Sequence, residues 1–186
     1  MHKAIFFDRD GTLIENAHYL SSLDSVVLIE SMLEFACLAQ QRGYLLIGIT
    51  NQSGIARGMF TELFVHETHK YLDKLFMAYN VAITAWYYCP HHPTAAVVEE
   101  YKKQCGCRKP LPGMLQQAAQ DYSIDLIDSV MIGDSDSDIQ AGHSAGCVAI
   151  LVKEIVNLSR DEKIKLLDLL SSKSSLMQTT QQMMQK

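Results

Sequence analysis

The sequence predicts an α/β fold in which a parallel sheet is covered by helices on both faces. Short apolar segments alternate along the chain with longer segments of helical periodicity. The short segments are apolar almost throughout, which is typical of strands buried on both sides in a parallel sheet. Polar residues follow several of these segments, at the sheet edge where open α/β folds bind their ligands.

The expected elements follow one another in a regular order. Five segments are predicted as buried strands, and four as helices that lie between them. The strands are 4–7, 44–49, 83–88, 129–132 and 147–152, and the helices are 31–42, 61–79, 112–122 and 136–145. Thr61 and Glu62 suit the first turn of the second helix, and Pro112 suits the start of the third because its missing N–H costs nothing there.

Length and composition favour one globular domain. The chain has 186 residues, of which 48% are hydrophobic and 20% charged, which excludes global disorder. We expect a single domain over residues 1–170. The polar, compositionally biased segment 171–186 is typical of a frayed helix or a disordered tail.

The charge balance and hydropathy restrict the expected partners. The formal net charge of −5 argues against a role in coating nucleic acid. The sequence contains neither an apolar run long enough to span a bilayer nor a signal-peptide core. We therefore expect a cytoplasmic monomer that binds neither nucleic acid nor membrane.

Acidic and basic residues stand where the predicted strands end. Asp8 and Asp10 come directly after the first strand, Thr50 follows the second, and Asp134 follows the fourth. Lys109 lies in the loop before the third helix. Because the carboxyl ends of parallel strands meet at one edge of a sheet, these side chains are expected to face a common cleft.

Three carboxylates in one cleft need a cation. At 4 Å and an effective dielectric near 20, each pair would repel by about 4 kcal/mol. Mg²⁺, which prefers oxygen ligands, would relieve this repulsion and admit a phosphate group. Lys109 and Thr50 would then hold phosphoryl oxygens. Each motif alone is more often a turn, but the four in this order favour a site.

These four motifs resemble those of the haloacid dehalogenase (HAD) superfamily of phosphohydrolases. The resemblance implies a Rossmann-like, three-layer fold of the capless type, since helix, strand and loop use up the segments between the motifs. It implies Asp8 as the nucleophile and Asp10 as the general acid and then the general base. It also implies Mg²⁺ held by the side chains of Asp8 and Asp134 and the backbone carbonyl of Asp10, with Asp138 orienting the metal site.

A second cluster matches a zinc site. Cys89, His91, Cys105 and Cys107 provide three thiols and one imidazole in two close pairs, as in closed tetrahedral zinc sites. A closed site leaves no position for substrate, so we expect a structural Zn²⁺ that orders the loop 89–107. This loop leads directly into Arg108 and Lys109, so ordering it would also position these two positively charged side chains beside the phosphate.

The two clusters together narrow the resemblance to the D-glycero-D-manno-heptose 1,7-bisphosphate 7-phosphatase family, over about residues 3–150. Histidinol-phosphatases share the zinc cluster but have a shorter loop. The thirteen residues between His91 and Cys105 (92–104) favour the heptose family. One departure is Ser135, where the heptose enzymes carry a lysine.

The resemblance implies Mg²⁺-dependent hydrolysis of the 7-phosphate through an aspartyl-phosphate, in the biosynthesis of nucleotide-activated heptose for lipopolysaccharide. Substrate contacts are expected from Asn16, Ala17, His18, Tyr19, Thr50, Asn51, Gln52 and Ser53. Thr50, Arg108 and Lys109 would stabilise the transferring phosphoryl group. Arg57, beside the site, is either a contact for the second phosphate or a surface charge.

Other functions stay open at this point. Histidinol phosphate or another small sugar phosphate is the alternative substrate. A signalling module that holds a phosphate on Asp8 is disfavoured by Asp10, because an acid/base at that position promotes turnover. A zinc-stabilised interaction protein with a dead site is disfavoured by the presence of all four motif residues.

Overall fold

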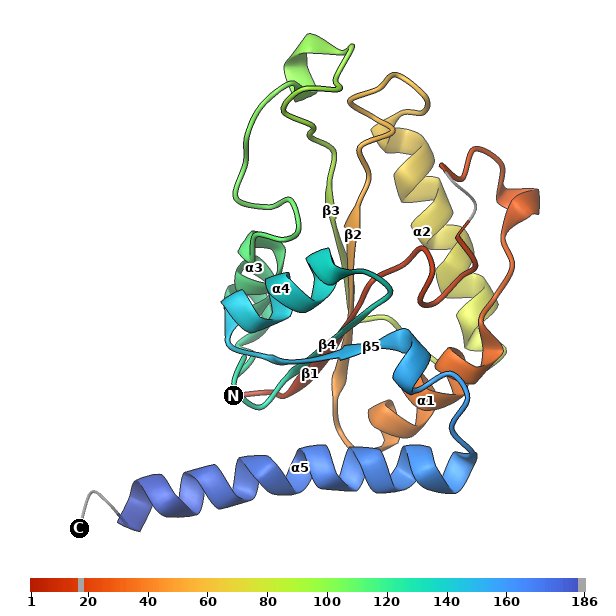
Figure 1. The fold of residues 1–186 in the computed structure, drawn as a ribbon. Helices are drawn as coiled ribbons and strands as arrows, with labels where there is room; N and C mark the ends of the chain where they lie inside the picture. Colours follow the sequence, from red (N-terminus) through yellow and green to blue (C-terminus); the bar gives the residue numbers. More distant parts are fainter. Residues whose placement is uncertain (17–18, 184–186) are drawn as a thin grey trace.

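Five parallel strands form one sheet in the order β3-β2-β1-β4-β5 (Figure 1). The computed structural model describes residues 1–16 and 19–183, with side chains described up to residue 172. The strands are β1 (Ala4–Phe7), β2 (Leu45–Asn51), β3 (Ala85–Cys89), β4 (Val130–Gly133) and β5 (Val148–Leu151). The parallel sheet predicted from the apolar segments is confirmed.

The strand order creates a crevice between β1 and β4. The chain adds β2 and β3 on one side of β1 and then returns to place β4 on the other side. Ile5 is paired with Leu46 of β2 and with Val130 of β4, so β1 is the central strand. Ligands bind outside the carboxyl ends of strands at such a reversal of strand order. Asp8 and Asp134 follow directly on the two strands that flank the crevice.

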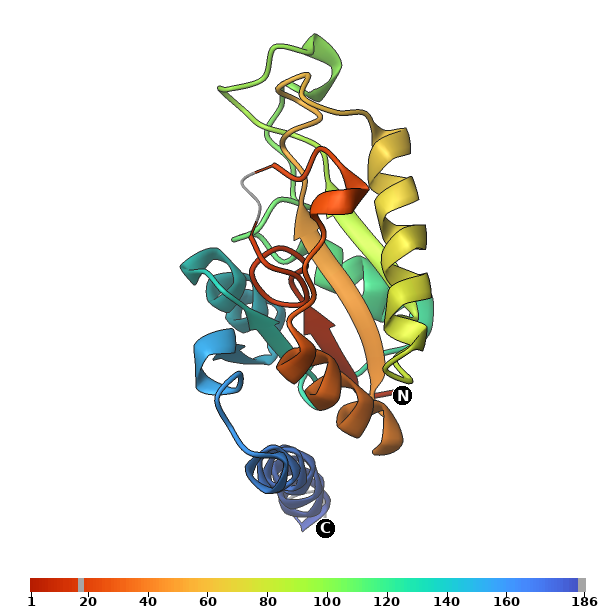
Figure 2. The same cartoon turned by 90° about the vertical axis from the view of Figure 1, so that its right-hand side faces the viewer.

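Helices cover both faces of the sheet (Figures 1 and 2). They are α1 (Glu30–Gln41), α2 (Glu62–Met77), α3 (Gly113–Tyr122), α4 (Asp136–Ala145) and α5 (Arg160–Met183), with short 3-10 turns at Leu23–Ser25, Glu99–Tyr101 and Val152–Glu154. Ile5 and Phe7 face the core formed with α1, α2 and α5. Ala4 and Phe6 face the core formed with α3 and α4. This alternation fits a central strand buried on both faces.

The observed boundaries differ from the predicted ones by a few residues. Thr61 caps α2, and its Oγ1 accepts a hydrogen bond from the backbone N–H of Phe64 (3.2 Å). Pro112 occupies the N-cap position of α3. β2 extends two residues beyond its predicted end at residue 49, because Thr50 and Asn51 continue the pairing with β3. This extension carries Thr50 to the edge of the crevice.

No helix is predicted from the sequence between residues 152 and 171, but α5 begins at Arg160 and crosses the expected domain end at residue 170. Lys163 of α5 is buried and bonds to Ser31 (2.7 Å) and Glu34 (2.9 Å) of α1. A charged residue thus lies on the packed face of α5, which interrupts the apolar helical pattern in the sequence. Residues 171–183 continue this helix. No helix of the described chain is both long and apolar enough to cross a membrane.

Candidate active site

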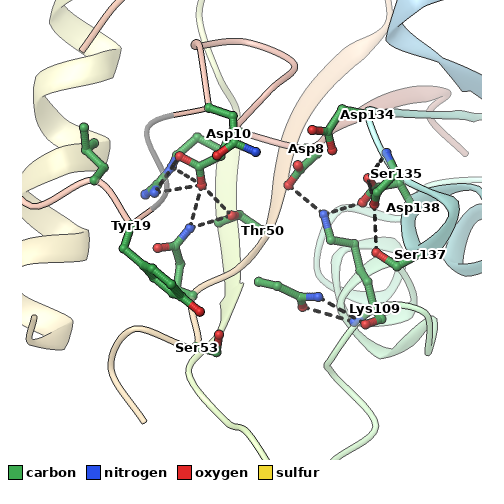
Figure 3. A pocket seen from close by; sticks show the side chains of 15 residues that line it. Asp8, Asp10, Tyr19, Thr50, Ser53, Lys109, Asp134, Ser135, Ser137 and Asp138 are labelled. Carbon is green, nitrogen blue, oxygen red and sulfur yellow. Dashed lines mark hydrogen bonds and ion pairs between the residues drawn. The ribbon is translucent and has the colours of Figure 1, made fainter. Parts of the chain in front are cut away.

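A cavity of about 290 Å³ opens at the carboxyl ends of β1, β2 and β4 (Figure 3). Most of its lining side chains are polar or charged. They are Asp8, Arg9, Asp10, Asn16, Tyr19, Leu20, Thr50, Asn51, Gln52, Ser53, Lys109, Asp134, Ser135, Ser137 and Asp138. The structure therefore brings together Asp8, Asp10, Thr50, Lys109 and Asp134, the five residues that the sequence placed in a common cleft.

Lys109 joins two carboxylates at the bottom of this cavity. Its Nζ lies 2.6 Å from Asp8 Oδ1 and 2.6 Å from Asp138 Oδ1, and it donates to the backbone carbonyl of Ile49 (2.8 Å). All three charged side chains are buried. Burial alone would lower the pKa of Lys109, but the two carboxylates outweigh it and raise the pKa above its ordinary value. Lys109 thus stays charged beside Asp8.

The carboxylates are crowded. Asp8, Asp134 and Asp138 can each offer an oxygen within 4.8 Å of the others. Burial, aided by the charges of Asp138 and Asp10, raises the pKa of Asp8 to about 7, against the opposing effect of Lys109. Burial and Asp138 also raise the pKa of Asp134. Excess negative charge on oxygen donors fits a hard divalent cation such as Mg²⁺. The carboxylate of Asp10 lies outside this cluster.

Gly11 allows Asp134 to approach the turn after β1. The backbone of Gly11 has a φ of +82°, in the left-handed region that favours glycine. A Cβ at this position would collide with the carboxylate of Asp134. Gly11 therefore permits both the turn after β1 and the close approach of the Asp134 carboxylate.

Asp138 is held by the first turn of α4. Its Oδ2 accepts hydrogen bonds from the backbone N–H (3.1 Å) and the hydroxyl (2.6 Å) of Ser135, the N-cap residue. Its Oδ1 faces Lys109. The hydroxyl of Ser135 also lies 2.9 Å from that of Ser137. Ser135 lines the cavity and joins this hydroxyl network.

Asp10 lies on the other side of the cavity, toward Thr50 and Tyr19 (Figure 3). The Arg9 guanidinium forms an ion pair with it (Nη2 to Oδ2, 2.9 Å). Gln52 donates to Asp10 Oδ2 (2.9 Å) and to Thr50 Oγ1 (2.7 Å). Arg9 is not among the site residues expected from the sequence. The position of Arg9 between Asp8 and Asp10 places it near the site, but the sequence does not show toward which of its neighbours the side chain points.

Asn51 ties the loop before α3 to β2. Its side-chain amide donates to the carbonyl of Lys109 (3.1 Å) and accepts from the N–H of Lys109 (3.1 Å). The described contacts of Asn51 thus fix the backbone of Lys109, although Asn51 also lines the cavity.

The remaining expected contacts are spread around the cavity mouth. Asn16, Tyr19 and Ser53 line it, whereas Ala17 and His18 lie outside the described residues. Arg57 does not line the cavity, but it lies next to Tyr19, which does. The guanidinium carbon of Arg57 is 5.8 Å from the centre of the Tyr19 ring. Arg108 lines a neighbouring cavity with Pro93 and Leu111 and donates to the carbonyl of His91 (3.4 Å).

The structure brings the cysteine and histidine cluster together. The three thiol sulfurs lie 3.2–3.5 Å from one another, and His91 Nδ1 lies 3.5 Å from Cys107 Sγ and 3.7 Å from Cys89 Sγ. A tetrahedral zinc ion with bonds of about 2.3 Å separates its sulfur ligands by roughly 3.8 Å, close to these spacings. The close contact between Cys89 and Cys107 lowers the pKa of Cys107 to about 5 and raises that of Cys89, so Cys107 is the thiol of this pair that more readily becomes a thiolate for a cation to bind.

Comparisons with known proteins agree with this geometry. The HAD-hydrolase-like family matches residues 106–165. D-glycero-beta-D-manno-heptose-1,7-bisphosphate 7-phosphatase from Photorhabdus laumondii is 44% identical over 138 residues, which are 74% of this chain and 73% of that protein. The corresponding enzyme from Escherichia coli K12 is 40% identical over 142 residues, 76% of this chain and 74% of that protein.

A solved structure is also similar. The D,D-heptose 1,7-bisphosphate phosphatase from B. bronchiseptica, complexed with magnesium and phosphate, is 27% identical, with a TM-score of 0.74 over 92% of this chain and 99% of that one. The resemblance found in the motifs is thereby confirmed. The chain belongs to the D-glycero-beta-D-manno-heptose-1,7-bisphosphate 7-phosphatase family, within the HAD-like hydrolases.

Proposed function

We propose that the protein removes the 7-phosphate from D-glycero-D-manno-heptose 1,7-bisphosphate in the biosynthesis of nucleotide-activated heptose for lipopolysaccharide. The observation that carries the proposal is the buried contact of 2.6 Å between Lys109 and Asp8 at the end of β1. Asp10 lines the same cavity from the opposite side. The family membership supplies the substrate class.

Asp8 is the nucleophile in this proposal. One of its carboxylate oxygens attacks phosphorus, the bond from phosphorus to the sugar oxygen breaks, and Asp10 gives a proton to the leaving oxygen. Asp10 then accepts a proton from a water molecule that attacks the phosphorus of the aspartyl-phosphate, which frees phosphate and restores Asp8. Lys109 and Thr50 hold oxygens of the phosphoryl group during both steps, and Arg108 assists from the loop edge.

Two metal ions belong to the proposal. The side chains of Asp8 and Asp134 and the backbone carbonyl of Asp10 would hold Mg²⁺, with Asp138 orienting the site. Bound Mg²⁺ supplies positive charge that lets a phosphate enter among the carboxylates. The residues Cys89, His91, Cys105 and Cys107 would hold a structural Zn²⁺ that fixes the loop leading to Lys109.

Recognition of the sugar is proposed for the loops around the cavity mouth. Asn16, Tyr19 and Ser53 line the cavity, and Ala17 and His18 belong to the same expected set. Thr50, Asn51 and Gln52 complete it. Arg57, next to Tyr19, would meet the second phosphate. We further propose that residues 1–170 are one phosphatase domain, with 171–186 as an appendage, and that the protein acts as a cytoplasmic monomer.

A ³¹P NMR assay tests the substrate. Zinc-replete protein with Mg²⁺ would be given each anomer of heptose 1,7-bisphosphate and, separately, histidinol phosphate. We expect loss of the 7-phosphate signal with retention of the 1-phosphate, and a rate on one heptose anomer far above that on histidinol phosphate. Asp8→Asn serves as the inactive control. Faster release from histidinol phosphate, or loss of the 1-phosphate first, would overturn the proposed substrate.

A further inference from the structure

Arg9 and Gln52 enclose the carboxylate of Asp10. Arg9 Nε lies 3.2 and 3.1 Å from Asp10 Oδ1 and Oδ2, and Arg9 Nη2 lies 3.1 and 2.9 Å from the same two oxygens. Gln52 Nε2 adds a hydrogen bond of 2.9 Å to Oδ2. The side chain of Arg9 is only 3% exposed, whereas that of Asp10 is 24% exposed. The carboxylate of Asp10 is therefore contacted by Arg9 and Gln52 on one side and is open to the cavity on the other.

Arg9 and Gln52, the two residues that hold the Asp10 carboxylate, are themselves fixed by further hydrogen bonds. The backbone carbonyl of Arg9 accepts hydrogen bonds from the N–H groups of Leu13 (3.0 Å) and Ile14 (3.1 Å), which fixes the turn that carries it. The amide of Gln52 is also bonded to Thr50 Oγ1 (2.7 Å), at the end of β2. A planar guanidinium that contacts both oxygens restrains the rotation of a carboxylate.

The two oxygens of Asp10 differ in their surroundings. Oδ2 accepts from Arg9 and Gln52 and lies 3.5 Å from the Thr50 hydroxyl. Among the described contacts, Oδ1 is approached by Arg9 alone. Since a carboxylate has about four lone-pair positions, Oδ1 keeps more room for a proton.

We propose that Arg9 is a positioning residue that, together with Gln52, holds Asp10 with Oδ1 directed at the leaving oxygen of the substrate. This inference rests on the proposed role of Asp10 as the general acid. Arg9 does not transfer the proton. It restricts Asp10 to the orientation from which Oδ1 gives a proton to the sugar oxygen and later accepts one from water.

Leaving-group dependence separates this role from a merely structural one. A sugar alkoxide must be protonated as it leaves, whereas 4-nitrophenolate is stable without a proton. We expect Arg9→Gln to reduce kcat on heptose 1,7-bisphosphate by about 100-fold, at the low end of general acid–base effects. On 4-nitrophenyl phosphate we expect a loss below about threefold. Arg9→Lys, which keeps the charge, should recover part of the loss on the sugar substrate.

The controls make each outcome decisive. Arg42→Gln removes an arginine whose ion pair with Asp168 lies outside the cavity, and it should leave both rates unchanged. Asp10→Asn should show the same selective loss as Arg9→Gln, and the double variant should lose no more than Asp10→Asn alone. Circular dichroism confirms that each variant is folded at the assay temperature.

Two results would contradict the account in different ways. An equal loss on both substrates in Arg9→Gln, with a selective loss in Asp10→Asn, would overturn the role of Arg9 and leave that of Asp10 intact. It would indicate that Arg9 contacts the phosphoryl group or supports the fold. No selectivity in Asp10→Asn would instead overturn the proposed general acid.

Discussion

Replacing Lys109 with methionine should destabilise the metal-free protein. Lys109 is the shared partner of two buried carboxylates, Asp8 and Asp138, each 2.6 Å away. Methionine keeps much of the side-chain volume but removes the charge, so that both acids lose their cation in the protein interior. Breaking a buried ion pair by removing one partner costs about 3–5 kcal/mol.

The cost should depend on pH. Lys109 lowers the pKa of Asp8, which burial raises to about 7. Without the lysine, the folded variant keeps a proton on Asp8 at higher pH, whereas the unfolded chain has already lost it. Stability of the variant relative to wild type should therefore fall further above pH 7, by up to about 1.4 kcal/mol per pH unit.

Thermal unfolding in zinc-replete, Mg²⁺-free buffer measures this effect. For a chain of this size, 3–5 kcal/mol corresponds to a decrease of roughly 6–20 °C in Tm. Lys74→Met, an exposed lysine of α2, is the matched control and should change Tm by little. Equal Tm values for wild type and Lys109→Met at pH 6 and pH 8 would refute the reasoning.

Three further changes test other parts of the site. Mg²⁺ affinity, measured by calorimetry, should weaken about tenfold per pH unit below pH 7, because binding requires ionised Asp8; equal affinities at pH 6 and pH 8 would contradict this. Gly11→Ala should lose Mg²⁺ binding and activity through its collision with Asp134, whereas Gly43→Ala, also at positive φ but with open space, should lose only stability; retained Mg²⁺ binding in Gly11→Ala would count against the geometry. Cys107→Ser should lose bound zinc by elemental analysis and also phosphatase activity, whereas Cys37→Ser should keep both; full zinc content in Cys107→Ser would rule out the four-ligand site.

Much of the fold follows from apolar periodicity. The five strands were predicted within two residues at each end, because buried parallel strands are apolar throughout. α5 was missed because Lys163, which contacts Glu34, is a charged residue on its packed face. Periodicity alone does not distinguish a buried lysine that has an ion-pair partner from one that faces solvent.

The sequence predicted the site residues whose place is set by the strand that they follow. Asp8 and Asp134 follow adjacent strands, so the topology brings them together. Side-chain direction was not predictable. Arg9 folds back onto its neighbour Asp10, and Asn51 binds the backbone of Lys109. These contacts depend on rotamers and loop paths that residue spacing does not specify.

The most direct test of the central claim is to find the phosphoryl group on Asp8. Protein quenched in acid during turnover of heptose 1,7-bisphosphate would be treated with borohydride, which reduces an acyl phosphate of aspartate to homoserine. Peptide mass analysis should then show homoserine at position 8 in wild type and at no position in Asp8→Asn. Homoserine at position 10 or 134, or hydrolysis of the bisphosphate by Asp8→Asn at the wild-type rate, would contradict the account.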